Sequence, residues 1–198
     1  MTLEGSSTLI DLGFDAPPKN PLFLLQKWLE IAERVGVNEP RGMVLSTVNG
    51  LNHPSSRVVL LKECDEKGVI FGTSQTSAKG KDLESNPWAA GTLWWRETLQ
   101  QVNFQGQVMR LSNEKSDELF YAKTREAQAV TALSCQSTPM ADEREMRDKI
   151  SSLIKTNEKI KRPAEWLAYH LASESIEFWH GSKDRFHKRL RYDQVNGS

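Results

Sequence analysis

The sequence predicts a fold that is mainly β with α, that is, a β-barrel or sandwich with packed helices, and two observations support this class. Short apolar and β-branched runs separated by turn residues recur between residues 43 and 110 and again near the C-terminus. A stretch with helical periodicity, residues 113–154, lies between them. With 198 residues and 38% hydrophobic content, the chain can bury one sizeable core.

The N-terminal part is expected to consist of an arm followed by a helix. Residues 1–19 are mixed in character and end near two prolines, so we expect a flexible arm before a single domain, residues 20–198. Asn20 can cap the helix and Pro21 suits its first position. Leucines at helical spacing continue toward Gly36, which can end the helix.

Five β segments and one short helix are expected next. Turn signals such as Asn49-Gly50 and Asp65–Gly68 separate the first segments. The short helix, residues 77–86, is stopped by Asn86-Pro87. The expected strands are 43–48, 56–62, 69–73, 89–96 and 100–110.

The following segment is expected to be helical and the ending β. Asp142 and Glu145 resemble a capping box at the start of a helix with one apolar face. The expected helices are 113–123, 125–133 and the one that follows residue 142. The last expected strands are 167–172, 175–179 and a short one at 189–192.

The charge balance disfavours a nucleic-acid binder. Lys and Arg together number 26, as do Asp and Glu, whereas nucleic-acid binders usually carry a basic excess. No apolar run approaches the ~18 residues needed to cross a bilayer, and the N-terminus lacks the pattern of a signal peptide. We therefore expect a cytoplasmic protein that binds neither nucleic acid nor membrane, with Cys64 and Cys135 as reduced thiols.

Several common catalytic templates are absent from the sequence. No Gly-x-Gly-x-x-Gly follows a strand, and neither a P-loop nor a Gly-x-Ser-x-Gly elbow occurs. The histidines lack the spacing of metal ligands, so no metal site is expected. They are His53, His170, His180 and His187.

Cations and amides at the ends of β segments are the candidate ligand-binding residues. Alternation along the strand points Arg57 and Lys62 to opposite faces unless a bulge intervenes, and the strand would offer a cation and backbone amides to an anionic planar ligand. Ser77 and Lys79 open a helix, where N–H groups and an ammonium can hold a phosphate. Gln101 needs polar partners within an apolar strand. The alternatives are charged strand ends and a solvated helix start.

The C-terminal segment combines aromatic and cationic side chains. Phe178, Trp179 and His180 precede a basic cluster of Arg185, His187, Lys188, Arg189 and Arg191. An anion pocket is the favoured interpretation, and a solvated basic tail or a nucleic-acid patch is the alternative.

In their order and spacing, these motifs resemble those of the pyridoxamine-phosphate oxidase family over residues 20–192. The motifs that carry the resemblance are Arg57–Lys62, Asp65–Gly68, Ser77-Ala-Lys79, Asn86-Pro87, Gln101, Gln136-Ser137, Glu177–Trp179 and Arg185–Arg189. The resemblance implies a split β-barrel with packed helices, which forms a homodimer and binds flavin mononucleotide (FMN) between its subunits.

The resemblance also implies roles for individual residues. The phosphate end of FMN would be held by Arg57, Lys79 and Ser137, with Ser77 at the same helix start. The ribityl chain or the flavin ring would contact Lys62, Gln101, Gln136, Trp179 and Arg189. Main-chain groups of Val58, Leu60, Gly72 and Thr73 would complete the cofactor site.

The substrate side departs from the vitamin B6 oxidases of that family, which hold a substrate phosphate with Lys, Tyr, Arg and Ser. Lys62 matches the Lys, but the other three positions carry Leu119, Lys123 and Ala127. Two hydroxyls are lost, and a bidentate guanidinium is replaced by a point charge. Patterns such as Trp95–Thr98 are instead similar to the phenazine-biosynthesis flavin oxidases of the family.

This second resemblance implies an FMN-dependent oxidase that converts hexahydro-, tetrahydro- or dihydrophenazine carboxylates toward phenazine carboxylic acids, with O2 as electron acceptor. The candidate substrate-binding residues are Lys62, Lys123, Arg185 and His187, and no catalytic residue is assigned. The alternatives are a pyridoxine/pyridoxamine 5'-phosphate oxidase and a non-enzymatic flavin-binding split-barrel protein.

Overall fold

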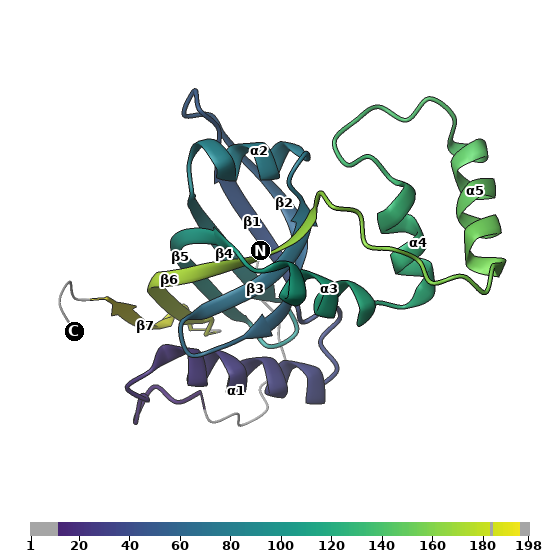
Figure 1. The fold of residues 1–198 in the computed structure, drawn as a ribbon. Coiled ribbons are helices and arrows are strands. Elements are labelled where there is room, and N and C mark those ends of the chain that lie inside the picture. Colours follow the sequence, from purple (N-terminus) through teal and green to yellow (C-terminus); the bar gives the residue numbers. More distant parts are fainter. Residues whose placement is uncertain (1–11, 183, 195–198) are drawn as a thin grey trace.

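A closed β-barrel with helices packed around it forms the centre of the computed structural model, which describes residues 12–182 and 184–194 (Figure 1). The strands are β1 (Gly42–Val48), β2 (Pro54–Cys64), β3 (Gly68–Ser74), β4 (Trp88–Trp95), β5 (Gln100–Arg110), β6 (Trp166–His180) and β7 (Lys188–Asp193). The helices are α1 (Pro21–Arg34), α2 (Ala78–Ser85), α3 (Asn113–Tyr121), α4 (Arg125–Leu133) and α5 (Glu143–Lys155). This arrangement confirms the predicted class, mainly β with α.

The long strand β6 closes the barrel. The strand order is β3-β2-β1-β4-β5-β6-β7 with antiparallel neighbours, and an additional pairing of β3 with the first half of β6 joins the ends. The second half of β6 leaves β3 and pairs with β7. Opposite this switch, a Cβ on Gly106 would lie 1.8 Å from the carbonyl oxygen of Ala172, so a glycine is needed there. The sheet is therefore split at β6, as expected for a split β-barrel.

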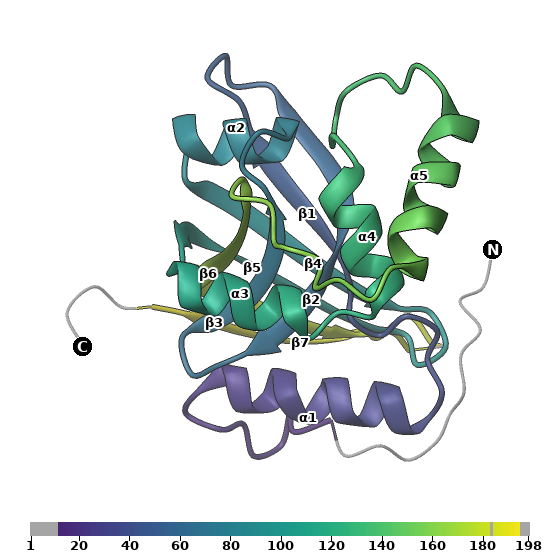
Figure 2. The same ribbon diagram turned by 45° about the vertical axis from the view of Figure 1, so that its right-hand side comes forward.

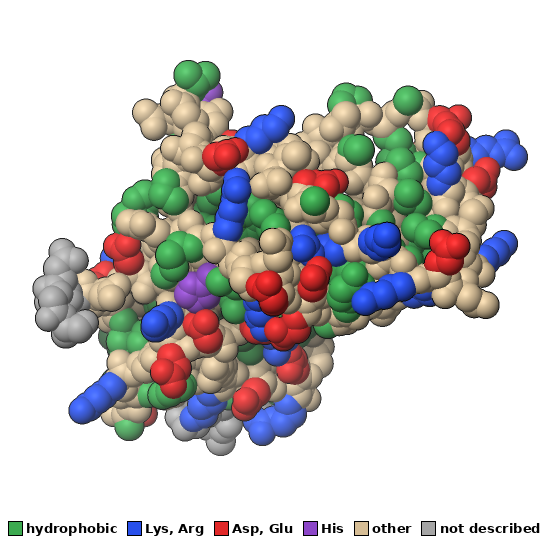
Figure 3. Space-filling model, in the orientation of Figure 1, with side chains coloured by type: hydrophobic (Ala, Val, Ile, Leu, Met, Phe, Trp, Pro, Cys, Tyr) green, Lys and Arg blue, Asp and Glu red, His purple; other side chains and the backbone are tan. Residues whose placement is uncertain are grey.

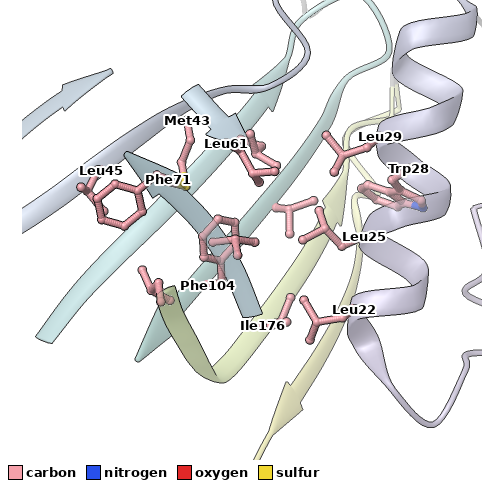
Figure 4. Packing of buried hydrophobic residues seen from close by; sticks show 14 of the residues in the cluster. Leu22, Leu25, Trp28, Leu29, Met43, Leu45, Leu61, Phe71, Phe104 and Ile176 are labelled. Carbon is pink, nitrogen blue, oxygen red and sulfur yellow. The ribbon is translucent and has the colours of Figure 1, made fainter. Parts of the chain in front are cut away.

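Helix α1 covers one end of the barrel and completes its core (Figures 1 and 4). Asn20 caps the helix as predicted, because its Oδ1 accepts a hydrogen bond of 2.9 Å from the N–H of Leu22. The apolar face of α1 points at the strands, and the ring of Trp28 lies 5.1 Å from that of Phe178, centroid to centroid. Both rings are fully buried, and each such side chain contributes about 1.5–3 kcal/mol to folding.

Helices α3, α4 and α5 lie beside the barrel (Figure 2), and we call α4, α5 and the loop 134–142 between them the helical lobe. A second hydrophobic cluster, which includes Phe120 and Trp166, joins these helices to the barrel. The guanidinium of Arg125 donates to the carbonyl oxygens of Leu153, Ile154 and Thr156 at the end of α5. One arginine thus fixes the end of a helix that has no fully buried residue.

Of two expectations near the chain ends, the structure corrects one and tests the other only in part. The segments 167–172 and 175–179, expected as two strands, form the single strand β6, because its pairing with β5 continues past the extra residue Glu174. Residues 12–19 lie against α1, where the indole N–H of Trp28 donates to the carbonyl oxygen of Leu12. The rest of the expected arm, residues 1–11, lies outside the described residues, so the division into arm and domain stays a prediction.

The face of the molecule drawn in Figure 3 carries charges of both signs. In the space-filling view of Figure 3, basic and acidic side chains are interspersed over the barrel and the helical lobe, with no broad area of one sign. None of the helices in the described ranges is long and apolar enough to cross a membrane.

Candidate functional site

A pocket of about 580 Å³ opens between the barrel and the helical lobe. Its lining comes from β2, β3, the start of α2, the turn between α3 and α4, the start of β6 and the lobe. The lining residues are Arg57, Val58, Val59, Leu60, Lys62, Gly72, Thr73, Ala78, Lys79, Lys123, Ala127, Gln136, Ser137 and Trp166. Four of them are cations and none is acidic, so the pocket suits an anionic ligand.

The pocket opens where β2 and β3 stop pairing. Their hydrogen-bonded register covers only the stretch from Leu61–Cys64 to Val69–Phe71. Beyond it, residues 57–60 of β2 and residues 72–73 of β3 line the pocket with strand edges that lie outside this ladder. These edges can offer main-chain donors and acceptors to a ligand, as the resemblance implied.

Both cations of β2 line the same pocket, and a β-bulge lies at the second of them. Strict alternation would place Arg57 and Lys62 on opposite faces, but the register with β3 shifts between Leu61 and Glu63. The cavity lies at the edge of β2 and is lined from both faces of the strand, by Val58 and Leu60 as well as by Val59, so Arg57 and Lys62 both reach it. Opposite faces were expected unless a bulge intervened, and the structure has such a bulge at Lys62. No residue type in the strand predicts its position.

At one end of the pocket, Arg57 is held by a polar network. Its Nη1 donates to the carbonyl oxygen of Leu45 at 3.2 Å and to Oγ1 of Thr47 at 2.7 Å, and its Nη2 donates to Oγ of Ser55 at 2.5 Å. The carboxylate of Asp82 lies 3.7 Å from Nη2. Burial lowers the pKa of Arg57, and the charge of Asp82 acts in the opposite direction.

The start of α2 brings a lysine and the N–H of Ala78 toward the same end. Ser77 caps the helix and is buried, but it does not line the pocket. Lys79 Nζ donates to Oγ1 of Thr73 and to Oε1 of Gln136, both at 3.2 Å. The N–H of Ala78 donates to Oγ of Ser137 at 3.1 Å. Burial, and next the charge of Arg57, lower the pKa of Lys79, which an anion bound here would reverse.

Lys123 forms the other end of the pocket with Lys62. Its Nζ donates to Oγ1 of Thr131 at 2.9 Å and lies 4.0 Å from the centre of the Trp166 ring. Burial, and then the charge of Lys62, lower the pKa of Lys123 to about 8. Gly72 makes room for this arrangement, since a Cβ on it would lie 2.2 Å from the Trp166 ring.

A second group of predicted site residues lies elsewhere, on the outer face of the sheet, and we call it the aromatic platform. Gln101, Trp179 and Arg189 are cross-strand neighbours on β5, β6 and β7. The ring of Trp179 lies 6.1 Å from that of Trp94 and 4.8 Å from that of His187, centroid to centroid. Neither this group nor the exposed Arg185 lines the pocket.

The structure thus brings ten predicted residues into one pocket and leaves the others outside it. The ten are Arg57, Val58, Leu60, Lys62, Gly72, Thr73, Lys79, Lys123, Gln136 and Ser137. Leu119 is 5% exposed in the second hydrophobic cluster and does not reach the pocket, unlike its neighbours Lys123 and Ala127. Trp166 and Asp82 were missed, because a large apolar residue predicts a core position and a carboxylate in a polar helix predicts a solvated one.

The donor set of the pocket fits the phosphate end of a flavin nucleotide. Arg57 and Lys79 supply charge, while Ser137 and the start of α2 supply neutral hydrogen-bonding groups. The strand edges at residues 58–60 and 72–73 supply main-chain groups for the uncharged part of such a ligand.

Known proteins resemble the chain over nearly its whole length. Residues 29–157 match the family described as "Pyridoxamine 5'-phosphate oxidase", and residues 166–198 match "Pyridoxine 5'-phosphate oxidase C-terminal dimerisation region". "Dihydrophenazinedicarboxylate synthase" of Pseudomonas chlororaphis is 39% identical over 181 residues, 91% of this chain and 82% of that protein. The protein of the same name from Burkholderia lata is 36% identical over 193 residues, 98% of this chain and 91% of that one.

A vitamin B6 oxidase is similar to almost the same degree. "Pyridoxine/pyridoxamine 5'-phosphate oxidase" of Mannheimia succiniciproducens is 40% identical over 179 residues, 90% of this chain and 85% of that protein. Overall sequence identity therefore does not distinguish a dihydrophenazinedicarboxylate synthase from a vitamin B6 oxidase. The distinction has to come from the residues of the pocket.

Among solved structures, PhzG from Burkholderia lata 383 in complex with tetrahydrophenazine-1-carboxylic acid superimposes with a TM-score of 0.92. It is 34% identical and covers 98% of this chain and 96% of its own. A pyridoxamine 5'-phosphate oxidase-related, FMN-binding protein from Nostoc punctiforme reaches a TM-score of 0.64 at 14% identity over 85% of this chain and 95% of its own, a likeness of fold alone.

Proposed function

Because the chain belongs to the pyridoxamine 5'-phosphate oxidase family, we propose that it is an FMN-dependent oxidase that dehydrogenates reduced phenazine carboxylates toward phenazine carboxylic acids, with O2 as electron acceptor. The observation that carries the proposal is the pocket with one pair of cations, Arg57 and Lys79, at one end and another, Lys62 and Lys123, at the other. One pair would bind a cofactor phosphate and the other a substrate carboxylate.

The cofactor would be held by groups that the structure places together. Arg57, Lys79, Ser137 and the N–H of Ala78 would bind the phosphate, and Gln136 would bind next to them. When bound, FMN supplies the two-electron redox chemistry that no protein side chain provides. The task of the chain is to orient the reduced ring of the substrate and to neutralise its carboxylates.

The aromatic platform would act on the pocket of a second copy. The outer face of the sheet exposes apolar side chains, with Val58 68%, Leu60 46% and Val44 39% exposed. Trp94, Trp179 and Gln101 lie on the same outer face according to the register of the strands. Residues 166–198 match a dimerisation region, which supports a homodimer with FMN at the subunit interface.

In this dimer, Gln101, Trp179 and Arg189 of one subunit would contact FMN in the pocket of the other. The neighbouring Arg185 and His187 would then lie on the substrate side and bind a carboxylate together with Lys62 and Lys123. The neighbouring rings of Trp94 and Trp179, which are tilted by 53° against each other, would offer aromatic contacts to a planar tricyclic substrate.

Lys123 and Ala127 support a phenazine carboxylate over a vitamin B6 phosphate. A carboxylate has one negative charge and two oxygens, so it needs fewer donors than a phosphate, which can accept hydrogen bonds from a guanidinium and hydroxyls together. Lys123 lies inside the pocket and Ala127 lines it without a hydroxyl. The second candidate, a pyridoxine/pyridoxamine 5'-phosphate oxidase, is favoured only by the identity to such enzymes and by Lys62.

A side-by-side assay separates these candidates. The purified protein is given a reduced phenazine carboxylate or pyridoxine 5'-phosphate under air, and O2 uptake and the absorbance of the oxidised product are followed. We expect a larger kcat/KM for the phenazine. A larger value for pyridoxine 5'-phosphate would favour the vitamin B6 activity, and bound flavin that neither substrate bleaches without O2 would favour a non-enzymatic flavin carrier.

A further inference from the structure

Asp82 of α2 is a buried carboxylate next to the pocket, although it does not line it. The residue is 9% exposed, and its Oδ2 accepts a hydrogen bond of 2.6 Å from Oγ1 of Thr47 and one of 3.2 Å from Oγ of Ser55. These two hydroxyls are also the acceptors for the guanidinium of Arg57. Three polar side chains from β1, β2 and α2 thus surround one arginine.

The direction of these hydrogen bonds depends on Asp82. A hydroxyl has one proton to donate and two lone pairs to accept with. Because Thr47 and Ser55 both donate to Asp82, their lone pairs are left for Arg57. Thr47 is 0% exposed, so without the carboxylate its hydroxyl group would have no water molecule to donate a hydrogen bond to.

The contacts leave part of the guanidinium free for a ligand. Of the five N–H donors of an arginine, two on Nη1 bind Leu45 and Thr47, and one on Nη2 binds Ser55. Within the described part of the chain, no hydrogen bond uses the remaining donors on Nε and Nη2 of Arg57, a side chain that lines the pocket.

We propose that Asp82 is a positioning residue for the cofactor phosphate: it commits the protons of Thr47 and Ser55 and thereby holds Arg57 with two N–H donors available to the anion. The inference rests on the proposed function, in which Arg57 binds the phosphate of FMN. Asp82 itself never touches the ligand in this arrangement and acts through Arg57.

Simple electrostatics makes the opposite prediction. A carboxylate 3.7 Å from the guanidinium repels an incoming phosphate, so removal of its charge alone would strengthen FMN binding. Positioning predicts weaker binding, because an arginine without its partners loses the fixed geometry that an anion needs. The sign of the change in FMN affinity therefore decides between the two effects.

The test measures FMN and riboflavin, which lacks the phosphate, by flavin fluorescence on the full chain stripped of flavin. In wild type we expect FMN to bind more tightly than riboflavin. Asp82→Ala should weaken FMN at least about tenfold, in line with loss of charge-assisted hydrogen bonds, and leave riboflavin within about twofold. Asp82→Asn should also weaken FMN. The matched control is Asp117→Asn, which removes a carboxylate that pairs with another arginine, Arg162, and does not line the pocket, and it should change neither affinity.

A double-mutant cycle shows whether Asp82 acts through Arg57. In an Arg57→Ala background, Asp82→Ala should have no further effect on FMN affinity. If Asp82→Ala does not fold, as judged by thermal unfolding, Thr47→Val keeps the carboxylate and should reproduce the loss of FMN affinity.

Four outcomes overturn the inference. Tighter FMN binding by Asp82→Asn would mean that charge repulsion dominates, and equal losses for FMN and riboflavin would mean a structural role. Unchanged FMN affinity in Arg57→Ala, or equal affinity of wild type for both flavins, would refute the proposed phosphate contact itself, and the role of Asp82 would fall with it.

Discussion

Lys123 should make substrate binding depend on pH in a range where few lysines titrate. Burial and the charge of Lys62 lower the pKa of this lysine to about 8. Below that pH the ammonium is present and can bind a carboxylate, and above it the neutral amine cannot. The affinity for substrate should therefore be highest well below pH 8 and should be lost as the pH rises through about 8.

The size of the effect follows from the fraction of ammonium. With a pKa of about 8, roughly nine-tenths of Lys123 is charged at pH 7 and roughly one-tenth at pH 9. If only the charged form binds the substrate carboxylate, kcat/KM should fall about tenfold between these two pH values.

The assay is a pH profile of kcat/KM for a reduced phenazine carboxylate in wild type and two variants. Lys123→Met should lower the value at pH 7 and abolish the step near pH 8. Lys123→Arg should remove the step but keep the affinity, because a guanidinium stays charged over this range. Lys159→Met is the control, since Lys159 also lies over a ring, that of Tyr121, but outside the pocket. A step of unchanged size in Lys123→Met would refute the reasoning.

Two further predictions concern the pocket wall and the outer face. Gly72→Ala should push the Trp166 ring from its place and lower the free energy of unfolding by about 1–3 kcal/mol in urea titrations, whereas alanine at the exposed Gly50 should change it by less than about 0.5 kcal/mol. An equal effect at both sites would contradict the tight contact. Val44→Asp should turn the proposed dimer into a monomer in sedimentation experiments and reduce bound flavin, and Val35→Asp, equally exposed on another surface, should do neither. A dimeric Val44→Asp would place the interface elsewhere.

The elements of the fold could be predicted because their signals are local. The cap at Asn20 and the turn at Asp65–Gly68 mark element ends within a few residues, and the structure agrees at both places. The closure of the barrel could not be predicted in this way. It depends on the pairing of β3 with β6, which joins segments almost a hundred residues apart, and no short-range pattern specifies such a pair.

The part of the candidate site that could be predicted consists of charged side chains within recognisable motifs. Arg57, Lys62 and Lys79 could be named from their motifs, and the structure gathers them in one pocket. Asp82 and Trp166 could not be named, since their effect depends on neighbours that only the fold supplies. The contact of individual residues with FMN stays a prediction for all of them.

The length of β6 has a consequence for how two chains would together form the sites of a dimer. Trp166 lines the pocket and Trp179 belongs to the aromatic platform, and thirteen residue steps, or about 40 Å along the strand, separate them on β6. The platform does not line the pocket of its own chain, so in the proposed dimer every site would be built half by each chain. A chain with a damaged pocket and a chain with a damaged platform would then be complementary defects. Mixed into one heterodimer, they would restore one intact site from two inactive parents.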